Sequence, residues 1–191
     1  MATNKDAAFG LRAIGKVGQN RDNQGLSEYS IAASSTAIYQ NDPVQAAATG
    51  YIGVANNSTA VLLGSLNGVF YTDSSTKKPT WANHLEASNA ATDIVGFVSD
   101  DPYERFEVQS NGTNAITQAS VFFNYNISYV AGDSANYLSK VELDESTGVS
   151  TTAQLRLIGF SKDPDNNDIS SANVNMVVTI NEHFLKSTTG I

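Results

Sequence analysis

The sequence contains no cysteine, two histidines and four prolines, and charged residues make up only 16% of its 191 positions. Without cysteine there is no disulfide framework and no thiolate metal site, as in a protein made in a reducing cytoplasm. No stretch approaches the roughly 20 apolar residues of a membrane span, and the first residues lack a signal-peptide pattern. We therefore expect a chain that neither crosses a membrane nor is secreted.

Motifs that carry catalysis are also missing. The sequence has no G-x-S-x-G elbow, no Walker loop and no G-x-G-x-x-G. Only His84 and His183 supply imidazole, so we expect structural or surface roles for both. Carboxylate pairs exist, but a glycosidase needs two carboxyls facing each other across a cleft, and acidic turns are expected on an acidic protein. The sequence predicts no enzyme and no cofactor, with a hydrolase as the third interpretation of function.

Serine, threonine and asparagine are abundant, at 56 of 191 residues. These side chains suit strand faces and turns and compete with helical hydrogen bonding, so the composition favours an all-β fold. The net charge is −8 and the only adjacent basic pair is Lys77-Lys78, which makes nucleic acid an unfavourable partner. We expect one mainly-β domain, a β-sandwich or distorted β-barrel with long loops and an extended N-terminal arm.

The alternation of apolar and polar residues predicts strands along most of the chain. A Ser65-Leu66-Asn67-Gly68 hairpin is expected between two of them, and Val44–Ala48 could instead begin a short helix. The expected strands are Glu28–Ala32, Ala37–Gln40, Val44–Ala47, Tyr51–Ala55, Ala60–Leu63, Val69–Thr72, Asp93–Val98, Tyr103–Gln109, Ala119–Val130, Gln154–Phe160 and Val174–Ile180. Tyr137–Leu143 is predicted as a strand or a short turn, followed by a loop at Ser146-Thr147-Gly148.

Two segments are expected to be irregular. Residues 1–25 form an N-terminal arm with at most one edge strand near Phe9 to Ile14, and residues 26–191 form the β-rich domain. Residues 1–21 carry a net charge of +3 and the remainder −11, so the arm either docks on an acidic neighbour or another subunit or is only a solvated tail. Residues 73–91 are predicted to be a long, contact-making loop that holds Lys77, Lys78 and the only tryptophan, Trp81.

Three of the four prolines follow an aspartate, and Asp101-Pro102 lies between two predicted strands. Proline fixes its own φ and disfavours a helical conformation in the residue before it, so Ser99–Pro102 is predicted to be a turn. Asp163–Asp168 groups carboxylate and amide oxygens of the kind that hard cations prefer, but it lacks the glycine and final glutamate of an EF-hand loop. A weak cation site and a turn capped by its own side chains are the two interpretations of that segment.

Several stretches resemble accessory capsid proteins, of the decoration or cement type, of marine tailed bacteriophages. The stretches are ATNKDAAFGLR at residues 2–12, NGVFYTDSSTKKPTWANH at 67–84, DIVGFVSDDPYERFEVQ at 93–109, and LIGFSKDPDNND with INEHF between 157 and 184. The resemblance implies a protein of the virion that is made in the host bacterial cytoplasm. It also implies binding to the outside of an icosahedral shell, where the chain stabilises the lattice of the major capsid protein.

Closed rings are common at capsid symmetry axes, so we expect a homotrimer, with a dimer second. The residues expected to contact the capsid or another subunit are Phe9, Leu11, Arg12, Lys77, Lys78 and Trp81. The alternative function is a carbohydrate-binding or fibre-like head appendage, because exposed aromatic side chains such as Trp81 and Tyr103 can stack on sugars.

Overall fold

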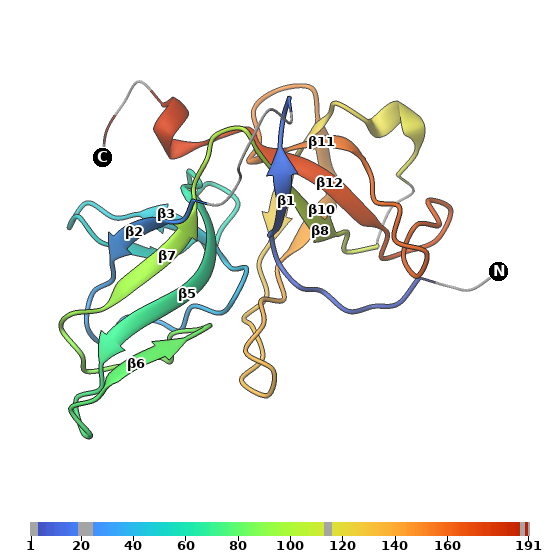
Figure 1. The fold of residues 1–191 in the computed structure, drawn as a ribbon. Coiled ribbons are helices and arrows are strands. Elements are labelled where there is room, and N and C mark those ends of the chain that lie inside the picture. Colours follow the sequence, from blue (N-terminus) through green and yellow to red (C-terminus); the bar gives the residue numbers. More distant parts are fainter. Residues whose placement is uncertain (1–3, 19–24, 113–115, 188–189, 191) are drawn as a thin grey trace.

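The computed structural model describes residues 4–18, 25–112, 116–187 and 190. Parts of the predicted arm, residues 1–3 and 19–24 with Arg21 among them, lie outside the described residues. The described chain consists of two antiparallel sheets that pack together, with two short 3₁₀-helices (Figure 1). Neither sheet closes into a barrel, so the predicted mainly-β sandwich is confirmed and the barrel alternative is not.

The first sheet, called sheet A, is built from the N-terminal strand and most of the second half of the chain. Its strand order is β1-β8-β12-β11-β9-β10, and every pair is antiparallel. The strands are β1 (Arg12–Lys16), β8 (Glu104–Gln109), β9 (Asn124–Ser128), β10 (Glu142–Val149), β11 (Leu155–Phe160) and β12 (Asn175–Ile180). The 3₁₀-helices η1 (Gln118–Ser120) and η2 (Phe184–Lys186) precede β9 and follow β12.

The second sheet, called sheet B, uses residues from the first half of the chain. Its order is β2-β7-β5-β3-β4, and β6 also pairs with β5. The strands are β2 (Ser27–Ser30), β3 (Pro43–Ala46), β4 (Ile52–Val54), β5 (Gly64–Thr72), β6 (Pro79–Ala82) and β7 (Val95–Ser99). Among the described residues, no helix is long and apolar enough to cross a membrane.

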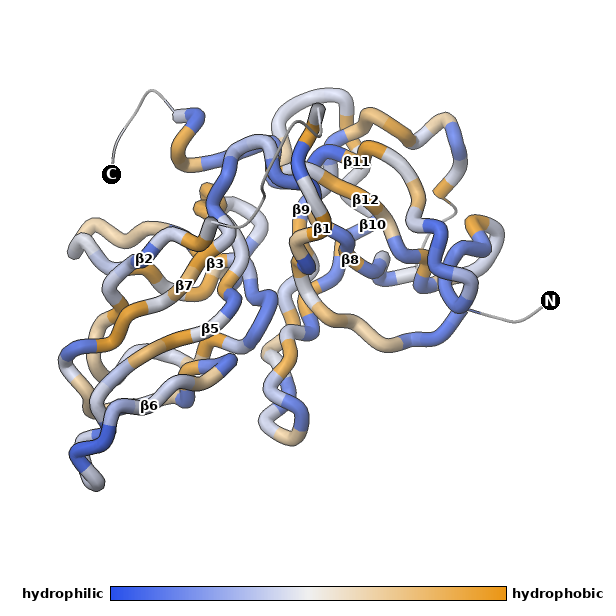
Figure 2. Tube along the Cα trace, viewed as in Figure 1, coloured by the Kyte–Doolittle hydropathy of each residue, from blue (hydrophilic) through white to orange (hydrophobic). Residues whose placement is uncertain are grey.

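Each sheet has its own cluster of buried apolar residues. The cluster on sheet A includes Phe106, Leu157 and Val178, and the cluster on sheet B includes Leu66 and Val98. Hydrophobic residues accordingly concentrate along the strands of both sheets (Figure 2). Tyr129 packs against both clusters, so it lies at the junction of the two sheets.

A buried carboxylate lies near this junction. Asp42 has no exposed surface, and its Oδ2 accepts a hydrogen bond of 2.8 Å from the main-chain N–H of Tyr39. Among the described residues, the other oxygen, Oδ1, has no hydrogen-bond partner. Burial without a counter-charge raises the pKa of Asp42 to about 6.

The Asp-Pro corner carries the chain from sheet B to sheet A. Glu104 N–H donates to the Asp101 carbonyl at 3.0 Å, and Tyr103 N–H donates to the Asp101 side chain at 2.8 Å. The turn expected at this corner is therefore confirmed, although it closes two residues later than predicted. It links β7, predicted from its β-branched and aromatic residues, to β8, predicted from its alternation.

Several local predictions were wrong. The strands expected at Ala37–Gln40 and Ala60–Leu63 are only isolated bridges, at Ile38, Gln40 and Leu62. The expected Ser65–Gly68 hairpin is a bulge inside the continuous strand β5, where the register with β7 shifts between Leu66 and Gly68. The expected long loop at 73–91 contains β6, which pairs with β5 to form a hairpin. The expected strand at 119–130 is regular only in β9, and β10 runs through the expected loop at 146–148. These conformations depend on pairing and packing with other parts of the chain, which local propensity does not register.

Candidate functional site

The N-terminal segment, residues 4–16, lies along sheet A of its own chain. Gly10, with φ at +75°, turns the chain so that Leu11 enters the core, where Leu11 is fully buried. Phe9 is half-buried, and the guanidinium of Arg12 lies 4.7 Å from the centroid of its ring. These three predicted contact residues are therefore engaged within the chain.

The basic residues of this segment that the structure describes all pair with carboxylates of the same chain. The pairs are Lys5 with Asp165 at 2.6 Å, Arg12 with Glu107, and Lys16 with Asp101 at 2.5 Å. Hydrogen bonds to their partners raise the pKa of Lys5 and Lys16. These cations, which were expected to bind an acidic neighbour, thus bind carboxylates of their own chain.

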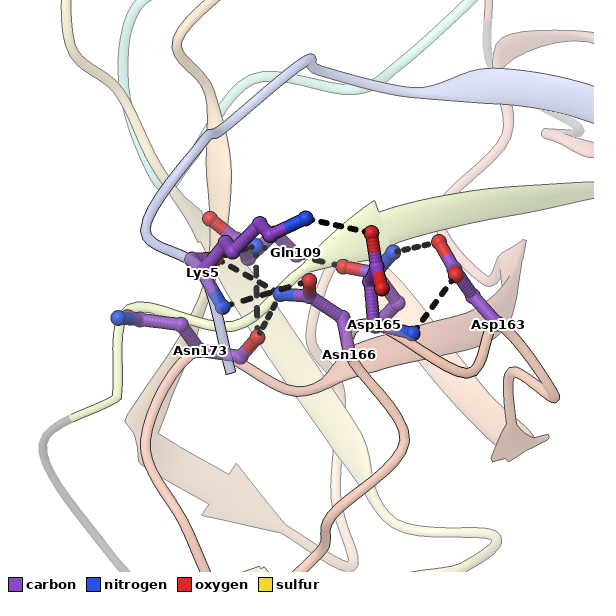
Figure 3. A network of polar contacts seen from close by, with 7 residues as sticks. Lys5, Gln109, Asp163, Asp165, Asn166 and Asn173 are labelled. Carbon is purple, nitrogen blue, oxygen red and sulfur yellow. Dashed lines mark hydrogen bonds and ion pairs between the residues drawn. The ribbon is translucent and has the colours of Figure 1, made fainter. Parts of the chain in front are cut away.

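Two side-chain amides hold the main chain of the same segment (Figure 3). Asn166 donates to the Lys5 carbonyl at 2.7 Å and accepts from the Lys5 N–H at 3.4 Å. Gln109 donates to the Lys5 carbonyl at 2.9 Å and accepts from the Ala7 N–H at 2.8 Å. Asn166 also donates to the Asn173 carbonyl at 2.8 Å, which fixes the amide in place. The arrangement recognises backbone groups, so its role is to fasten the segment to sheet A.

In the acidic segment Asp163–Asp168, considered above as a weak cation site, carboxylates accept hydrogen bonds from nearby backbone N–H groups. Asp163 accepts from the N–H of Asp165 at 3.1 Å, and Asp168 accepts from the N–H of Ser170 at 3.0 Å. These are the side-chain-capped turns of the second interpretation. In the described part of the chain, no three histidine or carboxylate side chains come together as a metal site.

The predicted lysine pair lies at the turn between β5 and β6. Asp73 organises this turn by accepting hydrogen bonds from the N–H groups of Ser75 and Thr76, at 3.0 and 2.6 Å. The hydrogen bonds from Thr76 and Ser75 lower the pKa of Asp73. Lys77 and Lys78 are both exposed, and Lys77 adopts a positive φ of 58°.

Beside this turn, three aromatic side chains form a patch on the outward side of sheet B, called here the aromatic face. Trp81 on β6 is 61% exposed and Phe70 on β5 is 38% exposed. The ring of Trp81 lies 4.5 Å from that of Phe97 on β7 and 6.4 Å from that of Phe70. The surface position expected for Trp81 is confirmed, although Trp81 belongs to a strand and not to a loop.

Gly68 makes room for the indole of Trp81. A Cβ at position 68 would lie 3.7 Å from Trp81 Cζ2 and 3.0 Å from the Ala82 carbonyl oxygen. Gly68 is also paired with Phe97 across the β5–β7 ladder. The indole therefore extends over a position without a side chain and reaches Phe97 on the far strand.

A small polar cleft continues from the aromatic face. It has a volume of about 230 Å³ and is lined by Arg12, Ala13, Gln40, Asn41, Ser65, Leu66, Asn67 and Ser99. Ser65 on β5 is paired with Ser99 on β7. Ser99 lies two positions along β7 from Phe97, on the same face of the strand. Successive outward positions of a strand are about 7 Å apart, so the cleft and the rings form one surface.

The two histidines occupy different settings. His84 is stacked between Tyr137, at 3.7 Å, and Tyr39, at 6.3 Å between ring centroids. His183 is 2% exposed, and its Nδ1 accepts from the Leu185 N–H at 3.1 Å. Burial lowers the pKa of both, that of His183 to about 4, so both are neutral at pH 7.

Asp6 and Glu142 line a larger hollow of about 460 Å³ beneath the N-terminal segment. Burial, reinforced by the charges of Asp6 and Glu145, raises the pKa of Glu142 to about 7. Glu142 therefore keeps its proton to a higher pH than an ordinary glutamate does. The hollow brings Glu142 near the carboxylate of Asp6, and residues 6–9 of the fastened N-terminal segment form one part of its walls.

A further surface feature was missed by the sequence analysis. Phe122 is 73% exposed and has a φ of 75°, in the left-handed region, and its neighbour Phe123 is 42% exposed. Two main-chain hydrogen bonds hold this corner against Leu157: Phe122 N–H to the Leu157 carbonyl at 2.8 Å, and Leu157 N–H to the Phe123 carbonyl at 3.0 Å. The alternating pattern around these residues predicted a strand, and no local signal marked the corner.

The fold and these surfaces define a two-sheet antiparallel β-protein that exposes aromatic side chains at separate places on sheets A and B. Comparison of the sequence with protein-family models and curated proteins, and of the structure with solved structures, found no match.

Proposed function

We propose that this chain is a non-enzymatic structural protein that binds the outside of an icosahedral phage capsid and stabilises the lattice of the major capsid protein. A ligand that binds the assembled lattice but not dissociated subunits shifts the equilibrium toward the lattice. The sequence resemblance to decoration proteins motivates the proposal. The observation that carries it here is the exposed corner formed by Phe122 and Phe123.

The corner is unfavourable for the isolated chain in two respects. A left-handed backbone at a residue with a side chain costs about 1–2 kcal/mol, and the Phe122 ring is 73% exposed to water. Strained backbone that the surrounding structure maintains is concentrated at functional sites. Buried aromatic side chains are in turn the commonest anchors of protein–protein interfaces. We assign the contact with the major capsid protein to this corner.

The proposal includes self-association. Oligomers on a symmetric shell are closed rings, and a homotrimer suits a local three-fold axis, with a dimer second. The net charge of −8 keeps the free protein soluble before it meets the shell. Light scattering on the purified chain gives its mass directly, and a strictly monomeric protein with a monomeric footprint on the shell would remove the trimer from the proposal.

Co-expression with the major capsid protein of the same genome tests the function. Electron microscopy of the resulting particles should show density for this chain across the whole outer surface. Phe122→Gly should abolish that density, whereas the double variant Lys77→Ala/Lys78→Ala serves as the control at the other exposed site. Bare shells with the unaltered chain would overturn the proposal. Loss of density only in the lysine variant would move the contact to the β5–β6 hairpin, as the sequence analysis expected.

A further inference from the structure

We propose that the aromatic face and the polar cleft beside it form a binding site for an uncharged oligosaccharide. The site consists of Trp81, Phe97 and Phe70 as the stacking surface and the amide and hydroxyl groups of the cleft as hydrogen-bonding partners. This activity goes beyond capsid binding and does not rest on it.

The stacking surface is available without rearrangement. Trp81 is 61% exposed even though its ring contacts Phe97 at 4.5 Å, so one side of the indole is covered and a large part remains open. The C–H groups of a sugar ring carry partial positive charge and are attracted to the negative face of an aromatic ring. Sites for small ligands combine such apolar surfaces with a few placed polar groups.

The cleft supplies these polar groups from three parts of the chain. Asn67, the bulged residue of β5, is exposed between the cleft and Gly68, and Ser99 lines the cleft from β7. Gln40 also lines the cleft and accepts a hydrogen bond from Asn83 at 3.3 Å, which orients its amide. Amide and hydroxyl groups donate and accept hydrogen bonds, as sugar hydroxyls do.

Charge restricts the ligand to uncharged sugars. Arg12 is the basic residue of the cleft lining, and its charge is neutralised by its pair with Glu107. Glu28 is exposed opposite Phe97 on the neighbouring strand, and the chain as a whole carries −8. An anionic polysaccharide would find no unpaired cation among the residues that line the cleft. The exposed Lys77 and Lys78 beside the aromatic face lie outside that lining, at the turn between β5 and β6.

A ligand with both apolar and hydroxyl surfaces fits this place better than an apolar protein surface. An apolar partner covering the face would bury the amides and hydroxyls of the cleft without hydrogen bonds, which costs about 1–3 kcal/mol for each group. In Figure 1 the hairpin of β5 and β6 lies at the far end of the molecule from the short yellow helix that precedes Phe122, so both surfaces can be used at once.

The single tryptophan provides the test, because its fluorescence reports on the proposed site alone. The unaltered chain is titrated with dextran, laminarin and yeast mannan as uncharged polysaccharides, and with alginate as an anionic one. We expect at least one uncharged polysaccharide to shift or quench the emission in a saturable manner and alginate to have no effect. Absence of any change with all three uncharged polysaccharides, or a response to alginate alone, would overturn the inference.

Variants place the binding on the site. Trp81→Ala removes the fluorescent probe, so its binding is measured by retardation in gels that contain the polysaccharide, and retardation should disappear. Asn67→Ala keeps the probe and should weaken binding about tenfold or more, which corresponds to one lost hydrogen bond of about 1.4 kcal/mol. Tyr103→Ala removes another exposed ring, 62% exposed and located at the turn between β7 and β8, and should bind as the unaltered chain does.

The outcomes distinguish this inference from the proposed function. Circular dichroism and urea unfolding confirm that each variant is folded before binding is compared. Equal retardation of Trp81→Ala and the unaltered chain would overturn the site. If Trp81→Ala instead binds polysaccharide normally but fails to decorate capsids, the aromatic face is the shell contact and the glycan site is refuted. Release of reducing ends from a bound polysaccharide would refute the non-enzymatic proposal while leaving the binding site in place.

Discussion

The carboxylate of Glu107 on β8 is paired with the guanidinium of Arg12 on β1, the strand beside it at the edge of sheet A. The side chain of Glu107 is 8% exposed and that of Arg12 is 51% exposed, so the anion is the buried partner. The pair is therefore an intramolecular contact that joins β1, in the N-terminal segment, to β8 of sheet A.

Arg12→Ala should lower the free energy of unfolding by about 1–3 kcal/mol, because it leaves the buried Glu107 carboxylate without its partner. Urea unfolding at pH 7 measures the loss. Lys5→Ala is the matched control, since it breaks a fully exposed pair with Asp165 that water and salt already screen. An equal effect of the two variants would contradict the distinction between a buried and an exposed partner.

Leu11→Ala should lower the free energy of unfolding by about 2–5 kcal/mol, because a fully buried leucine is replaced by a cavity in the sheet A core. Deleting residues 2–12 should destabilise the chain at least as strongly, whereas a detached arm would leave the fold unchanged. Thermal unfolding followed by circular dichroism compares the two variants with the unaltered chain. A deletion variant with the original melting temperature would show that the segment is dispensable.

Asp42→Asn should change how stability depends on pH. The pKa of Asp42 is raised from its ordinary value of 3.8 to about 6 in the folded chain. The folded state therefore binds this proton more tightly than the unfolded state does. Stability contributed by this group is present below pH 4 and is lost as the pH rises to about 6. Asp42→Asn has no carboxyl to deprotonate, so it does not lose this stability. The difference in free energy of unfolding between the variant and the unaltered chain should therefore shift in favour of the variant by up to about 3 kcal/mol between pH 4 and pH 7. Urea unfolding across this range checks it, and a pH-independent difference would contradict the raised pKa.

Phe122→Gly should raise the free energy of unfolding by about 0.5–1.5 kcal/mol while reducing capsid binding. Glycine adopts the positive φ of this position without the cost that a side chain imposes, and the exposed ring contributes little to the fold. Phe123→Gly is the control, because Phe123 is outside the left-handed region and gains nothing from glycine. Higher stability together with weaker capsid binding in Phe122→Gly would identify Phe122 as a residue that contacts the capsid. A destabilised Phe122→Gly would show that the ring contributes to packing.

The sequence predicted the parts of the fold that local chemistry decides. Phe106 and Val108 alternate with polar neighbours on β8 and are buried as expected. The turn at Asp101-Pro102 follows from the restricted φ of proline. The carboxylates of Asp163 and Asp168 cap nearby N–H groups, as short acidic side chains do in turns.

The remainder depends on contacts between distant residues. Asn67-Gly68 is a frequent turn sequence, yet here β5 pairs with β7 at Gly68 and with β6 from Val69 onward, which keeps the chain extended. Phe122 is exposed because the backbone of Leu157 holds the corner, 35 positions along the chain. The surface position of Trp81 was predicted from the sequence, whereas its contact with Phe97 over Gly68 required the register of three strands.

The hydrogen bonds between the Asn166 side chain and the Lys5 backbone join residues that are 161 positions apart. During synthesis the segment that contains Lys5 is made well before the loop that contains Asn166. Chains of this kind must close long loops before their terminal contacts form, which slows folding. Residues 4–16 are therefore secured only after the segment around Asn166 has been made, 161 positions further along the chain.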